Sequence, residues 1–356
     1  MTTIRRIRIS PPLINSSCAW SSELHELQTL FDSPHTGAVT TRTTTLLGFI
    51  ETSEHTVAFT HDTRSSLNSY GYSPHPLATY IKDVHTILTN APSGSTKPII
   101  LSITSSSPSS ITSMMDAIQE LRTKLQDSQG PISRVAIELN TSCPNIKGSP
   151  PPAYTVARLA PILSALASYF WRDRTLVIGL KLPPYVYATQ FDELIEIVAS
   201  FSRPDPSDKT CRLNPFAFFT STNTLGNSLL FADQALWSKP IQESRDNSDG
   251  GDIDADGILA NTRTFSLPTV LGGLAGEAIH SLSLGNVYSL TRALGKHEDE
   301  SIRAIIVIGV GGVTTKEAHR RMRQAGARVV ACATILGREG VKAFESVSLT
   351  DEEVMA

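Results

Sequence analysis

Eight short apolar segments, each ending abruptly at a polar residue or a glycine, constrain the fold of this 356-residue chain more than any other feature. Most of them are continuously apolar rather than alternating, which is typical of strands covered on both faces in a parallel sheet. The segments span residues 12–15, 38–41, 99–103, 135–139, 176–182, 216–222, 304–308 and 329–333.

Segments with apolar residues at three- and four-residue spacing alternate with these predicted strands. They span residues 23–31, 76–88, 111–125, 153–170, 189–201, 278–294, 315–325 and 339–347. Eight strand–helix units predict an α/β fold, a (β/α)8 TIM barrel, rather than an open doubly wound sheet, because no GxGxxG motif follows the first strand. We expect a single domain over residues 1–356.

Two stretches interrupt the repeat. Residues 42–75 are polar and irregular, and we expect additional strands and loops there over the C-terminal mouth of the barrel. Residues 238–266 are acidic and contain glycine, which predicts a mobile, solvated loop insertion. Residues 252–257 resemble a calcium loop, but Arg263 stands where a bidentate glutamate is needed, so no metal site is predicted.

Composition argues against several classes of protein. A net charge of −3 provides no basic excess for nucleic acid, and no run of 18 apolar residues predicts a membrane span. The four cysteines form no CxxC pair, which favours a reducing compartment, the cytoplasm. The basic N-terminus meets Pro11 and Pro12 without an apolar core, so we expect no secretory signal.

Polar side chains gather where the predicted strands end, which is where barrels of this type carry their chemistry. Lys181 directly follows the apolar residues 177–180, so its stem must be buried and its charge needs an anionic partner at the barrel top. Cys143 lies in an asparagine-containing loop closed by Pro144, where a thiol can act as a base or a nucleophile. Cys332, inside the eighth strand, is interpreted as a core residue.

Small residues after the last two strands predict a phosphate site. Gly311 and Gly312 follow the seventh strand, and Ala333 and Thr334 follow the eighth. Such residues let backbone N–H groups approach phosphate oxygens, and a short helix N-terminus is expected next to them. Residues 271–276, LGGLAG, offer a third loop for close approach. The phosphate alone fits either a sugar phosphate or FMN.

Six short motifs, the first two of them ELNTSCPN at residues 138–145 and KLPPY at residues 181–185, together resemble those of class 1 dihydroorotate dehydrogenases. Residues 138–145, ELNTSCPN, resemble the family's ELN-x-SCPN, and residues 181–185 resemble its KLPPY. Residues 223–227 resemble NSIGN, and three further segments are similar to INSMG, FGGIGG and IGTGGI, at residues 67–71, 271–276 and 308–313. The matches follow the family order over nearly the whole chain, and the KLPPY and FGGIGG forms resemble the class 1A branch.

The resemblance implies an FMN enzyme that oxidises (S)-dihydroorotate to orotate in pyrimidine (UMP) biosynthesis. Class 1A members are cytosolic homodimers that use fumarate as the electron acceptor, with no membrane or nucleic-acid partner. Class 2 members use a serine base and a membrane-associated extension, whereas this chain has Cys143. Class 1B members need a partner subunit, an alternative that one sequence leaves open.

Roles carry over to the matching positions. By resemblance, Cys143 takes the C5 proton of the substrate while a hydride passes from C6 to flavin N5, and Lys181 stabilises the negative charge at the flavin N1–O2 edge. The implied substrate residues are Arg42, Asn68, Ser69, Tyr70, Gly71, Tyr72, Asn140, Asn145, Asn223 and Thr224. The implied FMN residues are Ser17, Cys18, Arg42, Thr43, Asn140, Lys181, Thr222, Gly272, Gly273, Gly311, Gly312, Ala333 and Thr334.

Two departures from the family pattern support alternative functions. Arg42 stands where the family has a lysine that contacts flavin and substrate, and a forked guanidinium does not simply replace an ammonium. Cys18 stands where the family has a glycine. The alternatives are a diverged FMN oxidoreductase acting on another cyclic amide or enone, and a non-catalytic flavin-binding paralogue.

Overall fold

Eight parallel strands form the central sheet of the protein, for which a computed structural model describes residues 1–145, 152–236 and 264–350. Their order is β3-β16-β15-β12-β9-β8-β7-β4. The strands are β3 (Leu13–Asn15), β4 (Val39–Thr40), β7 (Ile99–Ile103), β8 (Val135–Asn140), β9 (Ile178–Leu182), β12 (Phe216–Ser221), β15 (Ile306–Val310) and β16 (Val329–Cys332).

The side chain of Asn15 joins the first and last strands of this order. Its Nδ2 donates to the carbonyl oxygen of Thr40 at 2.6 Å, and its Oδ1 accepts from the Thr40 N–H at 2.9 Å. An amide that pairs with a backbone in this way takes the place of a ladder hydrogen bond where β3 meets β4. The sheet is therefore nearly closed, and the predicted (β/α)8 barrel is confirmed.

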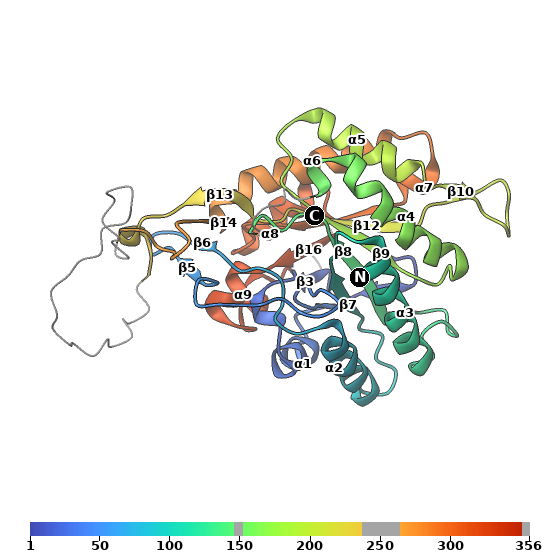
Figure 1. The fold of residues 1–356 in the computed structure, drawn as a ribbon, viewed down its shortest axis with the longest axis horizontal. Helices are drawn as coiled ribbons and strands as arrows, with labels where there is room; N and C mark the ends of the chain where they lie inside the picture. Colours follow the sequence, from blue (N-terminus) through green and yellow to red (C-terminus); the bar gives the residue numbers. More distant parts are fainter. Residues whose placement is uncertain (146–151, 237–263, 351–356) are drawn as a thin grey trace.

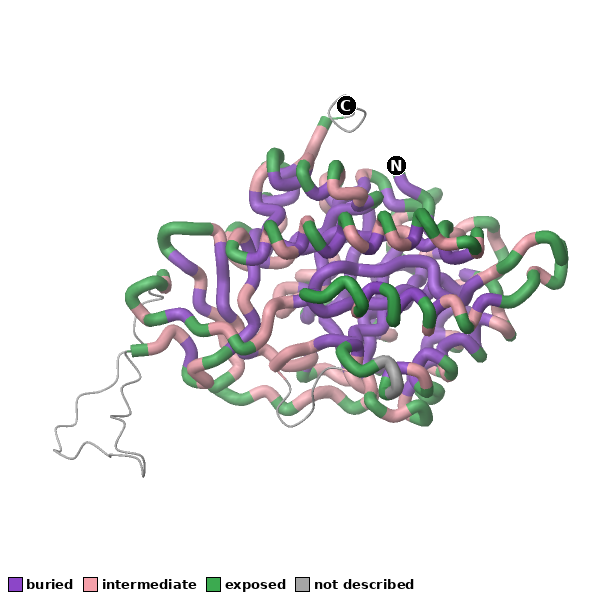
Figure 2. The backbone as a smooth tube through the Cα atoms, turned by 90° about the horizontal axis from the view of Figure 1, so that it is seen from above, coloured by how far each residue is buried: buried purple, intermediate pink, exposed green. Residues whose placement is uncertain are grey.

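Helices surround the barrel (Figure 1), and their apolar residues are buried in one core cluster with those of the strands. They are α1 (Leu24–Asp32), α2 (Leu77–Asn90), α3 (Pro108–Lys124), α4 (Val156–Arg172), α5 (Ala188–Ala199), α6 (His280–Lys296) and α8 (Lys316–Gln324). Buried residues concentrate in the centre of the molecule and exposed residues lie on the outer helix faces (Figure 2). Among the described helices, none combines the length and the apolar character that a membrane span requires.

A hairpin of β1 (Thr2–Ile4) and β2 (Ile7–Ile9) fills one end of the barrel, a feature not expected from the sequence. Ile4, Ile7 and Ile9 are buried in a cluster with residues that point into the barrel, including Ile100 and Val177. These two residues lie at or just before the N-terminal ends of β7 and β9. Among the described residues the hairpin thus occupies this end of the barrel, and the cavity described below lies at the opposite end.

Two predictions near the C-terminus were wrong in their limits. The seventh strand begins two residues later than predicted, because α7 (Glu300–Arg303), with Asp299 at its N-terminus, precedes it. The predicted helix 339–347 is instead two short helices, α9 (Thr334–Glu339) and α10 (Ala343–Val347). Gly340 separates them with φ of +73° and ψ of −167°, a backbone conformation that glycine adopts readily and residues with a Cβ rarely do.

A smaller antiparallel sheet stands over the barrel mouth, at the left of Figure 1. It contains β13 (Leu225–Leu229), β14 (Leu271–Gly276), β6 (Ser65–Asn68) and β5 (Val57–Phe59), in that order. Strands β5 and β6 confirm the additional strands predicted in residues 42–75. A further pair, β10 (Arg203–Pro204) and β11 (Arg212–Leu213), lies between α5 and β12. The predicted acidic insertion 238–266 falls mostly outside the described residues.

Candidate active site

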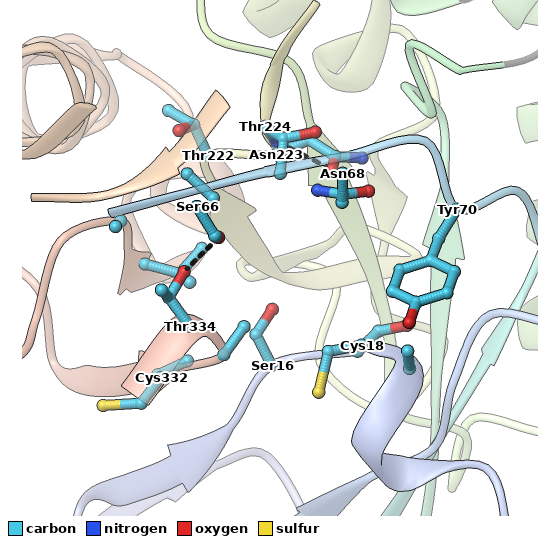
Figure 3. Close-up of a pocket in the computed structure, with 18 of the residues that line it drawn as sticks. Ser16, Cys18, Ser66, Asn68, Tyr70, Thr222, Asn223, Thr224, Cys332 and Thr334 are labelled. Carbon is cyan, nitrogen blue, oxygen red and sulfur yellow. Dashed lines mark hydrogen bonds between the residues drawn. The ribbon is translucent and has the colours of Figure 1, made fainter. Parts of the chain in front are cut away.

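A cavity opens at the C-terminal ends of the barrel strands, beneath the smaller sheet. It holds about 990 Å³ of space free of protein atoms, the solvent at its mouth included. Figure 3 shows Tyr70 at one side of this cavity and the pair formed by Ser66 and Thr334 at the other.

Most of the site residues predicted from the sequence line this one cavity. They are Ser17, Cys18, Arg42, Thr43, Asn68, Tyr70, Gly71, Tyr72, Asn140, Cys143, Asn145, Lys181, Thr222, Asn223, Thr224, Gly311, Gly312, Ala333 and Thr334. Among the described residues, Ser69, Gly272 and Gly273 do not border it. The Ser69 hydroxyl accepts instead from the Thr56 N–H at 3.0 Å, and the Gly273 carbonyl accepts from the side-chain Nδ2 of Asn68 at 3.1 Å.

Further lining residues were not predicted. Gly276 lies within the predicted loop 271–276, and Ser16 directly precedes the predicted Ser17, so their position next to predicted residues was the available signal. Ser66 comes from β6, and its hydroxyl lies 3.4 Å from that of Thr334, more than 260 residues away in the chain. Cys332 is buried in the core, as predicted, and also borders the cavity.

Lys181 projects from β9 into the cavity and is buried. Its Nζ donates to the hydroxyl oxygen of Ser16 and to the carbonyl oxygen of Ser17, both at 3.2 Å. In the described part of the chain no carboxylate pairs with this ammonium. A buried cation that has only neutral oxygen partners favours a ligand that carries or develops negative charge.

Cys143 follows β8 and lies in the same cavity, half-buried. Burial raises the pKa of its thiol, while the Asn145 backbone and the charges of Lys181 and Arg42 act in the opposite direction. The net shift is upward, so the thiol is protonated at neutral pH. The structure thus brings Cys143 and Lys181, 38 residues apart in the sequence, to one cavity.

Asparagine side chains hold one another in place around the cavity. The Nδ2 of Asn223 donates to the Oδ1 of Asn140 at 3.1 Å, and the Nδ2 of Asn140 donates to the Thr43 hydroxyl at 3.0 Å. In the connection that follows β8, the Nδ2 of Asn145 donates to the Oδ1 of Asn68, the last residue of β6, at 3.1 Å. Fixed amides provide both donors and acceptors, which suits a ring with carbonyl and N–H groups.

Glycines with positive φ form the end of the cavity near Thr334. The values are +77° at Gly276, +129° at Gly311 and +69° at Gly312. A Cβ at Gly312 would lie 2.5 Å from the Cβ of His280, so a side chain there meets both strain and a clash. These backbone conformations let consecutive N–H groups converge, and together with the Thr334 hydroxyl they fit a phosphate group.

His280 contacts the segment that contains Gly311. Its Nδ1 lies 2.9 Å from the Gly311 carbonyl oxygen, and its Nε2 accepts from the Nε of Arg321 at 3.3 Å. Arginine only donates, so Nε2 is the acceptor and Nδ1 carries the proton. Burial lowers the pKa of His280, which keeps the imidazole neutral as this arrangement requires.

Comparison with known proteins identifies the family of this chain. The sequence profile of the family described as dihydroorotate dehydrogenase matches residues 1–202 and 255–355. The chain belongs to the dihydroorotate dehydrogenase family. Members of this family are oxidoreductases that use a flavin cofactor.

Relatives in two streptococci bear the same curated name, "Putative dihydroorotate dehydrogenase A (fumarate)". The relative from Streptococcus pyogenes serotype M18 is 27% identical over 295 residues, which cover 83% of this chain and 74% of the relative. The relative from Streptococcus agalactiae serotype Ia is 29% identical over 220 residues, which cover 62% of this chain and 54% of the relative. These names agree with the class 1A resemblance of the motifs.

Proposed function

We propose that this protein binds FMN and oxidises dihydroorotate to orotate, with fumarate as electron acceptor, as a cytoplasmic homodimer in pyrimidine (UMP) biosynthesis. The observation that carries the proposal is that Cys143 and Lys181 face one cavity. A base and a cation at separate sites could not act on one flavin–substrate pair. The membership of the chain in the dihydroorotate dehydrogenase family supports the same reaction.

The residues present fit FMN. Gly311, Gly312 and Thr334 would hold its phosphate, and the buried ammonium of Lys181 would lie beside its ring system. FMN supplies the acceptor for a hydride. Lys181 would stabilise negative charge on the bound ring system, because a buried ammonium acts in a low dielectric and needs no reorientation.

Cys143 would remove the proton from C5 of the substrate. Its thiol must first lose its own proton, and the positive charges of Lys181 and Arg42 favour the thiolate against the effect of burial. The amides of Asn140, Asn145 and others would orient the ring by hydrogen bonds, which keeps the C5 proton within reach of the sulfur.

The decisive experiment is anaerobic flavin reduction. Addition of dihydroorotate to the FMN-loaded protein should bleach the flavin absorbance, and fumarate should restore it. Bleaching without recovery would support dihydroorotate as the substrate and reject fumarate as the electron acceptor. A spectrum unchanged by dihydroorotate or orotate would instead favour the diverged oxidoreductase, for which Arg42 is the motivating observation, since its charge is already paired with Glu51.

The rate of flavin reduction should rise with pH. Because burial raises the pKa of the Cys143 thiol, the thiolate fraction is small at neutral pH and grows by about tenfold for each pH unit below that pKa. Stopped-flow reduction by saturating dihydroorotate from pH 6 to 9 tests this expectation. A flat profile over that range would show that Cys143 deprotonation does not limit the step.

Gly312→Ala should weaken FMN binding by at least about tenfold. The positive φ at this position is strained for alanine, and its Cβ would clash with His280. Fluorescence titration of the apoprotein with FMN measures the change. Gly295→Ala is the matched control: this helical glycine has open space around its Cβ position, so the variant should bind FMN normally. Unchanged FMN affinity in Gly312→Ala would remove the Gly311–Gly312 segment from the phosphate site.

A further inference from the structure

Arg42 is the second cation of the cavity, and its charge is already engaged. Its side chain is buried, and both terminal nitrogens contact the carboxylate of Glu51, with Nη1 at 3.4 Å from Oε2. Nη2 also lies 3.4 Å from the Gly71 carbonyl oxygen, and the Tyr70 ring centroid lies 5.3 Å from Cζ. Lys181, by contrast, meets only neutral oxygens in the described structure.

Glu51 reaches Arg42 from outside the barrel. It lies in the segment between β4 and β5, and its side chain retains 25% of its exposure while that of Arg42 retains 7%. Arg42 borders the cavity, but Glu51 does not belong to the described lining. A carboxylate in this position changes the charge that a ligand meets without occupying space that the ligand needs.

We propose that Glu51 determines specificity: it competes with an anionic substituent of the substrate for Arg42. The two cations of the cavity would by themselves favour a ring that carries a carboxylate over an uncharged ring. Because Glu51 competes for Arg42, this preference is weaker. The inference rests on the proposed function, in which the anionic substituent is the carboxylate of dihydroorotate.

The physical reason is that one guanidinium cannot serve two carboxylates fully. A bidentate contact uses the donors of one edge of the fork, and the interaction is strong where solvent is partly excluded. A substrate carboxylate must displace Glu51, or share Arg42 with it and face a like charge. Removal of the Glu51 charge removes the competitor and the repulsion together, so selection for an anion rises.

A first test uses Cys143 as a reporter inside the cavity and needs no assigned substrate. Iodoacetate and iodoacetamide have nearly the same size but differ in charge, and both alkylate thiolates. Any change in the pKa of Cys143 alters both rates alike, so the ratio of the two rates isolates the effect of reagent charge. The alkylation of Cys143 in the FMN-loaded protein is followed by peptide mass spectrometry.

In Glu51→Gln the iodoacetate-to-iodoacetamide ratio at Cys143 should rise about three- to tenfold, since Arg42 becomes available to the anionic reagent. Glu54→Gln is the control, because Glu54 is an exposed carboxylate of the same loop. Its ratio should equal that of the wild type. An unchanged or lower ratio in Glu51→Gln overturns the proposal.

A second test measures ligand selection through the flavin absorbance spectrum. Orotate carries a carboxylate and uracil does not, so their affinity ratio reports the contribution of that group. In Glu51→Gln the preference for orotate should rise about tenfold, with uracil affinity unchanged. If both ligands bind and the preference stays constant, Glu51 does not set specificity.

The two tests separate this proposal from the proposed function. If the alkylation ratio rises while orotate leaves the flavin spectrum unchanged in both proteins, Glu51 controls anion access and the dihydroorotate reaction is the part that fails. If orotate binds but neither ratio responds to Glu51→Gln, the reaction stands and the role of Glu51 is rejected.

Discussion

Cys143→Ala should bind FMN as the wild type does and reduce it with dihydroorotate about 10²–10⁴-fold more slowly, the contribution typical of a positioned general base. The thiol borders the cavity together with Lys181 and Arg42, so its removal takes away the base but leaves both cations in place. Anaerobic stopped-flow absorbance gives the rate, and the flavin-to-protein ratio after purification gives the loading.

Cys211→Ala is the matched control for this substitution. Cys211 lies in the connection from β10 to β11 and does not belong to the described lining of the cavity, so the variant should keep the wild-type rate. The pH profile supplies a second discrimination: the rise with pH should disappear in Cys143→Ala and persist in Cys211→Ala. Wild-type reduction by Cys143→Ala would assign the C5 proton to another group.

The barrel could be predicted because its signal is local. Continuous apolar runs and helical spacings identify a buried parallel strand or an amphipathic helix without knowledge of the partner. The predicted ends of strands and helices were wrong where contacts with a neighbouring element determine them. Gly309 and Val310 look like the start of a turn, but they pair with Val330 and Ala331 of β16 and so prolong β15.

The N-terminal hairpin, by contrast, could not be predicted from a local signal in the sequence. Residues 2–9 have too few apolar residues to stand out, and their arginines suggest an exposed tail. Only the barrel interior gives Ile4, Ile7 and Ile9 a place to be buried. A short hairpin of this kind is stable only on a hydrophobic surface that the rest of the chain provides.

The residues of the candidate site likewise fall into those that the sequence could identify and those that it could not. Lys181 and Cys143 could be identified because a strand end fixes their location. Ser66 and Glu51 could not, since both come from the region over the mouth and meet their partners through contacts that no spacing encodes. The motif resemblance predicts that Arg42 stands in the place of a lysine, but only the structure shows that its charge is paired.

Arg122→Met should lower the free energy of unfolding by about 3–5 kcal/mol, because loss of one partner leaves buried charge uncompensated. Arg122 and Asp127 each retain 2% side-chain exposure, and Arg122 Nε lies 3.1 Å from the Asp127 carboxylate. Nη1 lies 2.6 Å from Asp173, and Nη2 donates to the Thr175 hydroxyl at 2.7 Å. The network ties α3 to the connection between α4 and β9.

Asp173 gives this network a pH dependence. Burial alone would raise the pKa of its carboxyl, but hydrogen bonds from Gln119 and Thr175 and the charge of Arg122 lower it to about 2. A carboxyl with a depressed pKa in the folded state stabilises the protein above its unfolded pKa of about 4 and loses that contribution as the pH falls towards 2. Arg122→Met should therefore show a shallower loss of stability over that interval.

Urea unfolding at equal FMN concentration measures both effects, because bound cofactor stabilises the native state by mass action. Arg174→Ala is the control: Arg174 pairs with Asp205 at 3.0 Å but retains 42% side-chain exposure, so its loss should cost less than about 1 kcal/mol. Folded Arg122→Met should still bind FMN, since the network does not border the cavity in the described structure. Equal stabilities of the two variants would mean that burial gives the Arg122 network no more weight than an exposed ion pair.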